Sequence, residues 1–250
     1  MLIRNALALL VLAIMLSCAS AVADVVNIPN ASFESPVVAD APPFATDIID
    51  SWQKTPAPAW WTAPASQGGL GYPAAQWYQG AGTFLNHGNV IDNTDGSQQA
   101  FLFSSPGLGL YQDLAATYQV GQSYHLVVAF EGGGYGMAAG VPVSILLYYR
   151  DGGNQMVTVG SATYLNTNTS GTLTHLTDCP LDIPAVAAGD AWAGKNIGVE
   201  IIATNDFTAM GGYWDLDNVR LTSSVPEPAC AALLLAGAGA MIRRRLGRSG

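Results

Sequence analysis

The sequence predicts an all-β protein folded as a jelly-roll β-sandwich. Short segments rich in β-branched and aromatic residues recur along the chain, separated by Gly, Asn and Asp. Between the two ends of the chain, no segment carries a convincing amphipathic helical period. The intervening stretch of about 200 residues is long enough for one domain with a real core. Many short strands at this spacing favour a sandwich, and the jelly roll in particular.

The expected elements divide the domain into a loop-rich first part and a strand-rich second part. Residues 36–93 are rich in Pro, Gly and Trp, so we expect long loops there, with strands only at about 48–53 and 75–78. The Asp-Gly-Gly-Asn sequence at 151–154 predicts a hairpin turn, and the polar stretch 163–174 predicts an exposed loop. The remaining strands are expected at 99–103, 109–114, 123–130, 141–149, 155–159, 173–177, 196–202 and 212–221.

Residues 1–23 have the pattern of a secretory signal peptide. Arg4 precedes an apolar run from 6 to 16, and Ala21-Val22-Ala23 is an A-x-A cleavage site before Asp24. The alternative of a permanent membrane anchor is disfavoured, because the apolar run is too short to span a bilayer. A lipoprotein modified at Cys18 is a further alternative, although Leu16 stands where a small residue is usual. We therefore expect residues 24–224 to form an exported ectodomain.

The charge of the ectodomain limits its partners. Its basic residues are Lys54, Arg150, Lys195 and Arg220, against seventeen acidic residues, a net charge of −13. A surface this acidic repels phosphate backbones, which excludes nucleic acid, but it suits divalent cations and neutral polysaccharide. Cys179 is the only cysteine in the ectodomain, so no disulfide can form within it.

A series of short motifs resembles the galactose-binding-domain-like jelly rolls of carbohydrate-binding modules. The motifs occur in the family's order across nearly the whole ectodomain, and the resemblance implies the same fold. They are I-P-N-A-S-F-E-S-P at 28–36, I-D-S-W at 49–52, D-G-S-Q-Q-A-F-L at 95–102, L-Y-Q-D-L at 110–114, V-G-Q-S-Y at 120–124 and W-D-L-D-N-V-R-L at 214–221.

The resemblance implies a structural Ca²⁺ held by Glu34 and Asp217. The first and last strands of a jelly roll lie near each other, and carboxylate oxygens are ligands that Ca²⁺ prefers. The alternative is that both are surface or turn carboxylates. Asp215 lies on the same strand face as Asp217, so it is either a third ligand or a solvated side chain.

Aromatic residues are concentrated in the loop-rich part and suggest a carbohydrate site. Trp60, Trp61, Trp77 and Tyr78 are the candidates for stacking on sugar rings of an extracellular polysaccharide, whereas Trp52 is expected in the core. The alternative is that these rings pack beneath their own loops, since buried Trp is common.

No catalytic motif is present in the sequence, so we expect a non-enzymatic protein. The chain has no G-x-S-x-G, H-E-x-x-H or C-x-x-C pattern, and its three histidines are widely separated. Glu131, followed by three glycines, is either at a loop mouth or a charge at a strand end. A divergent carbohydrate-active hydrolase is the remaining enzymatic alternative.

Residues 225–250 form a three-part C-terminal segment. Val225, Pro226, Glu227 and Pro228 precede a short apolar stretch at 229–242, and Arg243, Arg244 and Arg245 follow it. Positive residues after an apolar stretch are retained on the cytoplasmic side of the inner membrane. The segment resembles the PEP-CTERM sorting signal, which implies processing by an exosortase-type enzyme. The alternative is a plain single-pass transmembrane anchor.

The expected function follows from both ends and the domain between them. We expect an exported protein, held transiently in the inner membrane, that reaches the cell surface or extracellular matrix and binds polysaccharide without catalysis. The alternative is a structural envelope or biofilm-matrix protein with no specific glycan ligand.

Overall fold

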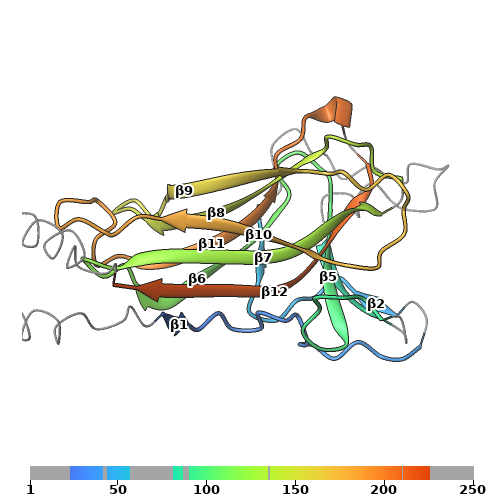
Figure 1. The fold of residues 1–250 in the computed structure, drawn as a ribbon, viewed down its shortest axis with the longest axis horizontal. Helices are drawn as coiled ribbons and strands as arrows, with labels where there is room; N and C mark the ends of the chain where they lie inside the picture. Colours follow the sequence, from blue (N-terminus) through green and yellow to red (C-terminus); the bar gives the residue numbers. More distant parts are fainter. Residues whose placement is uncertain are drawn as a thin grey trace, which may run out of the picture. The chain divides into compact units, whose positions relative to one another are not determined.

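The computed structural model describes residues 23–41, 44–56, 81–86, 90–134, 136–209 and 211–225. Residues 25–223 form one compact unit. Within it, two antiparallel sheets lie face to face (Figure 1). The predicted all-β sandwich is therefore confirmed.

The larger sheet has seven strands. Its order is β10 (Thr177–Ile183), β7 (Ser123–Gly134), β12 (Tyr213–Ser224), β5 (Gln98–Phe103), β4 (Ala81–Leu85) and β2 (Ala45–Thr46), and β1 (Asp24–Val26) also pairs with β12.

The smaller sheet has five strands. Its order is β3 (Gln53–Lys54), β6 (Gly109–Thr117), β11 (Asn196–Ala203), β8 (Pro142–Arg150) and β9 (Met156–Leu165). The one helix in the described ranges is the short 3₁₀ helix η1 (Phe207–Ala209). No helix in that part of the chain is long and apolar enough to cross a membrane.

The core lies between the two sheets because side chains alternate across each strand. On β11, Ile197, Val199 and Ile201 are fully buried and face the other sheet. On β12, Trp214 and Leu216 are also buried and face the core from the seven-stranded sheet. This alternation decides which side chains are left on the outer faces, where the sites described below are found.

The prediction of a strand at 173–177 is wrong. Residues 173–176 belong to a loop, and β10 begins at Thr177. The sequence of β10 contains two aspartates and Pro180, which argue against a strand. Proline is nevertheless tolerated here because β10 is at the edge of its sheet.

Two expectations in the loop-rich part need revision, one lies outside the described residues, and one is confirmed. Residues 48–52 connect the short strands β2 and β3 and are not themselves a strand. The strand β4 was not expected, and the strand expected at 75–78 lies outside the described residues. Trp52 is in the core as expected, because it is 6% exposed and its ring lies 5.4 Å from that of Phe33.

The loop expected at 163–174 begins later and is anchored inside the protein. β9 continues to Leu165, and Asn166 is 2% exposed. Its amide Nδ2 donates to the carbonyl oxygens of Met137 (3.3 Å) and Ala138 (2.9 Å). These hydrogen bonds pin the start of the loop to the segment that follows β7, and the Asn166 side chain lies against Gly132 of β7. From there the loop covers part of the outer face of the seven-stranded sheet.

Candidate functional site

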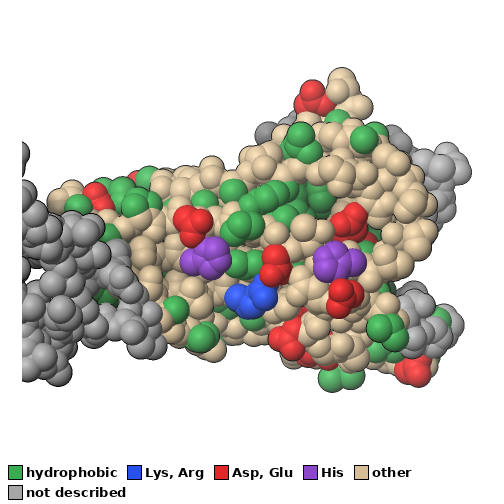
Figure 2. Space-filling model, in the orientation of Figure 1, with side chains coloured by type: hydrophobic (Ala, Val, Ile, Leu, Met, Phe, Trp, Pro, Cys, Tyr) green, Lys and Arg blue, Asp and Glu red, His purple; other side chains and the backbone are tan. Residues whose placement is uncertain are grey.

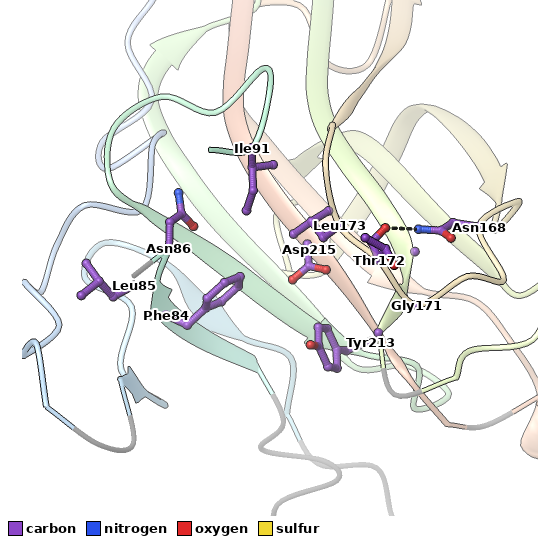
Figure 3. Close-up of a pocket in the computed structure, with 12 residues that line it drawn as sticks. Phe84, Leu85, Asn86, Ile91, Asn168, Gly171, Thr172, Leu173, Tyr213 and Asp215 are labelled. Atoms are coloured by element: carbon purple, nitrogen blue, oxygen red, sulfur yellow. Dashed lines mark hydrogen bonds between the residues drawn. The ribbon is translucent and has the colours of Figure 1, made fainter. Parts of the chain in front are cut away.

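A pocket of ≈ 240 Å³ opens on the outer face of the seven-stranded sheet (Figure 3). Its walls come from β4 and the segment after it, from β7, from β12, and from the loop between β9 and β10. The lining residues are Phe84, Leu85, Asn86, Ile91, Gly132, Gly134, Asn168, Gly171, Thr172, Leu173, Tyr213 and Asp215.

The glycines that follow Glu131 allow the walls of the pocket to approach each other. A Cβ atom at Gly132 would lie 2.4 Å from Asn166 Oδ1, and one at Gly134 would lie 2.4 Å from the Tyr213 ring. Both distances are shorter than real contacts allow, so only glycine fits at these positions. The Gly-Gly-Gly sequence therefore shapes the pocket by leaving room for the side chains opposite.

Asp215 is the acidic group of the pocket. It lies on β12 between Trp214 and Leu216, which both point into the core, so its own side chain points to the outer face. It is nevertheless only 3% exposed, because the loop between β9 and β10 covers it. Within the described residues, Asp215 Oδ1 has no hydrogen-bond partner. Burial, and secondarily the charge of Glu131, raises the pKa of Asp215 to about 8. At neutral pH, Asp215 is therefore a carboxylic acid that can donate a proton.

Other buried polar atoms near the pocket also lack partners. Asn86 Oδ1 and both polar atoms of the Gln99 amide are buried without a hydrogen bond to any described residue. Asn86 lines the pocket, and Gln99 lies opposite Phe84 in the β4–β5 pairing. Native proteins leave few buried polar groups unpaired, so a concentration of them beside a pocket indicates groups that a ligand satisfies.

Aromatic rings form one side of the pocket. Phe84 and Tyr213 both line it, and the ring of Phe101 lies 6.5 Å from each of theirs. The described lining contains no Lys, Arg or His. Aromatic faces beside a buried acid suit a flat, apolar molecule that acquires positive charge, because ring faces attract cations.

Glu131 lies behind the pocket and interacts with its wall. Burial raises the pKa of Glu131, and this effect is opposed by hydrogen bonds to Asn168 and Thr177 and by the nearby His175. Asn168 itself donates to the carbonyl oxygen of Thr172 (3.0 Å; Figure 3). Glu131 lies within β7, which continues to Gly134, and its hydrogen bonds to Asn168 and Thr177 connect the strand to the segment between β9 and β10.

His125 and His175, the two histidines within the described ranges, do not line the pocket. On the outer face of the same sheet, His125 is hydrogen-bonded to Asp182 (2.6 Å) and His175 to Asp92 (3.1 Å), and these pairs are exposed (Figure 2). They are surface pairs, in agreement with the absence of a histidine-based motif in the sequence.

Glu34, from the segment between β1 and β2, and Asp217, from β12, approach the same short segment, 95–98. Asp217 Oδ2 accepts the N–H of Asp95 (2.7 Å), and Glu34 Oε1 accepts the N–H groups of Ser97 (2.8 Å) and Gln98 (2.6 Å). Burial, together with the charges of Asp95 and Glu34, raises the pKa of Asp217 to about 7. No cluster of three or more acidic, His or Cys side chains suited to a metal occurs in the described part of the chain. The calcium site stays a prediction.

The other predicted site residues lie outside the described ranges. These are the aromatic candidates Trp60, Trp61, Trp77 and Tyr78, and the sorting residues Pro226, Glu227, Pro228, Arg243, Arg244 and Arg245. Val225, the first residue of the C-terminal segment, is its one described residue.

The pocket was not predicted from the sequence. Asp215 was expected only as a third calcium ligand or a solvated charge, and no role was expected of Phe84, Asn168 or Tyr213. One signal was present in the sequence, because an acidic residue between Trp214 and Leu216 is unusual within a strand. That pattern indicates a special position but not that the side chain is covered.

A sandwich with a covered, acid-containing pocket defines a small-molecule site of the kind that enzymes use. The sequence profile of the HpiC1-like family, described as HpiC1 cyclase, matches residues 24–222, and the chain belongs to this family. No curated protein matches the chain.

Solved cyclase structures share the fold. An apo cyclase from Fischerella sp. is 20% identical, with a TM-score of 0.59, over 82% of this chain and 98% of that one. The Stig cyclase Fisc from Fischerella sp. TAU, in complex with (3Z)-3-(1-methyl-2-pyrrolidinylidene)-3H-indole, is 19% identical, with a TM-score of 0.54, over 81% and 98%. Another cyclase from Fischerella sp. TAU is 19% identical, with a TM-score of 0.56, over 83% and 100%.

These comparisons overturn the expected function. The protein was expected to bind polysaccharide without catalysis, but its family is one of cyclases. The resemblance to carbohydrate-binding modules extends to the sandwich only: a family 16 module matches with a TM-score of 0.36, too low to support an argument about ligand. The prediction failed because the candidate acid belongs to no catalytic motif, and its burial depends on a loop far away in the chain.

Proposed function

We propose that the protein is a cyclase that closes a ring in an indole-bearing small molecule, with Asp215 as the general acid. The observation that carries the proposal is a buried carboxylic acid with an unpaired oxygen, in a pocket with aromatic walls. Membership of the HpiC1-like family and the indole compound bound by Fisc support the reaction class and the substrate class.

The proposed reaction begins with proton transfer. The Asp215 carboxyl donates its proton to an unsaturated bond of the substrate, which leaves a carbocation and the Asp215 carboxylate. The π electrons of the indole attack the cation and form the new carbon–carbon bond. The ring then loses a proton to the carboxylate, which restores both the aromatic system and the acid. The net change is an isomerisation, so neither an oxidant nor a reductant is required.

The surroundings of Asp215 assist this reaction in two ways. Phe84 and Tyr213 stabilise the cation through their ring faces and exclude water that would capture it. The buried amides of Asn86 and Gln99 provide the hydrogen-bonding groups that orient a polar group of the substrate. The acid needs no base partner, because burial, together with the nearby charge of Glu131, keeps it protonated.

The direct test compares Asp215→Asn with the unchanged chain on an indole that carries an alkenyl side chain. Mass spectrometry and NMR would follow formation of a cyclised product of the same mass. We expect Asp215→Asn to lower the rate by about 10²- to 10⁴-fold, the usual contribution of a general acid. Asp182→Asn removes an exposed carboxylate from the same sheet and is the matched control. Full activity of Asp215→Asn would exclude the proposed role of this acid.

We also propose that Glu34 and Asp217 hold a structural Ca²⁺. Their convergence on segment 95–98 and the burial of Asp217 support a cation there, because a cation offsets the cost of burying neighbouring carboxylates. In that role the ion would join the first and last parts of the sandwich.

Export and C-terminal sorting are likewise proposed from the sequence. The signal-peptide pattern at 1–23 and the Pro-Glu-Pro segment at 225–250 support an exported protein processed by an exosortase-type enzyme at the inner membrane. Mass spectrometry of the native protein should find its N-terminus at Asp24 and its C-terminus near Pro226. An intact Met1 and Gly250 would refute the proposal.

A further inference from the structure

A second hollow, of ≈ 550 Å³, lies on the outer face of the five-stranded sheet. It is on the opposite sheet from the Asp215 pocket, and the core separates the two. Its walls include Gln53 from β3, Tyr111 and Asp113 from β6, Arg150 from β8, and Lys195 and Asn196 at the start of β11.

Beside the hollow, the ring of Tyr148 packs over Gly198. A Cβ atom at Gly198 would lie 2.2 Å from the ring of Tyr148, so the ring occupies the space of the missing side chain. The Tyr148 hydroxyl donates to Asp113 Oδ1 (3.0 Å), on the strand beyond. This arrangement provides a rigid base for Arg150.

Arg150 is held in one orientation. Its Nε donates to Asp113 Oδ1 (2.8 Å), and its Nη1 donates to the carbonyl oxygen of Asn154 (3.1 Å). Its guanidinium carbon lies 5.7 Å from the ring centroids of both Tyr111 and Tyr148. A guanidinium has five N–H donors, so these two hydrogen bonds leave three for a ligand. A pre-oriented guanidinium loses little entropy when it binds a planar anion.

The polar groups around Arg150 favour an anion. The ectodomain has only four basic residues, and two of them, Arg150 and Lys195, line this hollow. Lys195 is exposed, whereas the charge of Asp113 is offset by its ion pair with Arg150. Glu200 lies opposite Tyr111 on the next strand, and burial raises the pKa of its carboxyl while the charge of Arg150 opposes that shift.

The aromatic groups indicate that the ligand has a flat body. The Tyr111 hydroxyl donates to Gln53 Oε1 (2.9 Å), which holds the ring in place and leaves the Gln53 amide nitrogen as a donor. The Tyr111 ring and the guanidinium plane together form a surface on which a second ring can stack.

We propose that this hollow binds a small aromatic carboxylate, whose carboxylate contacts Arg150 and Lys195 and whose ring packs against Tyr111. The site is independent of the cyclase proposal, since it uses the other sheet and none of the residues of the Asp215 pocket.

Benzoate is the probe that tests the proposal, with its affinity for the purified chain measured by NMR titration and calorimetry. Benzamide has the same ring without the charge, and acetate has the charge without the ring. We expect benzoate to bind about tenfold more tightly than benzamide, because it adds hydrogen bonds to charged groups. We expect it to bind up to about tenfold more tightly than acetate, because it adds a ring that stacks on Tyr111. We expect Lys195→Gln and Arg150→Gln each to weaken benzoate by about tenfold, because each removes a charged group that hydrogen-bonds to it.

Two control variants make the result specific. Arg220→Gln removes the same charge from the other sheet and should leave benzoate binding unchanged. Asp215→Asn should also leave it unchanged, which separates this site from the cyclase pocket. Lys195 is exposed, so Lys195→Gln remains a valid test even where Arg150→Gln fails to fold.

Four outcomes would overturn the proposal. They are no binding of benzoate at millimolar concentration, equal affinity for benzamide, equal affinity for acetate, and an equal loss of affinity in Arg220→Gln. A loss of benzoate binding confined to Arg150→Gln and Lys195→Gln would support it.

Discussion

The protonated state of Asp215 predicts that its removal changes how stability depends on pH. A carboxyl with a pKa of about 8 in the folded protein keeps its proton at pH 7, whereas the same group in the unfolded chain is ionised above a pKa of about 3.9. Between these two values the unfolded state binds fewer protons than the folded state. Rising pH therefore favours unfolding. The contribution of Asp215 to the free energy of unfolding is therefore fully present below about pH 4 and is lost as the pH rises to about 8.

The size of the effect follows from the difference between the two pKa values. Each pKa unit corresponds to about 1.4 kcal/mol, so at pH 7 ionisation of the unfolded chain reduces the free energy of unfolding by about 4 kcal/mol relative to pH 4. Asp215→Asn removes this dependence. It also buries an amide with unpaired groups, which costs about 1 kcal/mol at every pH. We expect the variant to be slightly less stable than the unchanged chain at pH 4 and about 3 kcal/mol more stable at pH 7.

Urea denaturation at pH 4, 5.5, 7 and 8.5 is the assay, with tryptophan fluorescence as the signal. The difference in the free energy of unfolding between the two proteins isolates Asp215. Asp217 contributes equally to the pH dependence of both proteins, so its effect cancels. Asp182→Asn is the control. That carboxylate is exposed, so this variant should not change from less stable than the unchanged chain at pH 4 to more stable at pH 7. A difference between Asp215→Asn and the unchanged chain that stays constant from pH 4 to pH 8.5 would show that Asp215 is ionised in the folded protein. The role of general acid would then be untenable.

Three further predictions concern the pocket, the calcium site and the cysteine. Gly134→Ala places a methyl group against the Tyr213 ring, which the neighbouring Phe103 ring holds in place. We therefore expect the variant to lose about 1–3 kcal/mol of stability and to lose cyclase activity. Denaturation measures the first effect and product formation the second. EDTA should lower the melting temperature of the unchanged chain and have no effect on Glu34→Gln combined with Asp217→Asn; an unchanged melting temperature in the parent chain would reject both ligands. Burial raises the pKa of Cys179 to about 12, so a thiol reagent at pH 8 should leave Cys179 unmodified until the protein unfolds, as checked by peptide mass spectrometry.

The strands that the sequence predicted well are those with clear two-residue alternation. On β6, Leu110 and Leu114 face the core, while Tyr111 and Asp113 face outward, and this pattern is visible in the sequence itself. The strand β10 was missed because Pro180 and its aspartates are compatible with either an edge strand or a loop. Only its position at the edge of the sheet resolves that choice.

The candidate site was less predictable because its properties depend on contacts between distant segments. Alternation with Trp214 and Leu216 places Asp215 on the outer face of β12, where an acid is normally solvated. It is covered because the loop after β9 is held against the segment that follows β7 by Asn166, whose hydrogen bonds reach residues 28 and 29 positions earlier. No local pattern contains that information.

The sequence by itself determined the all-β class, the direction in which most side chains point, and the shortage of positive charge, because each depends on composition or on the two-residue period of a strand. The tertiary structure alone decided that Asp215 is buried and protonated, and that Arg150 shares a hollow with Tyr111 and Lys195. Both depend on which distant segments cover or adjoin a given face. The acid–base behaviour of a carboxyl is set by the water removed from around it, and that is a property of the folded chain.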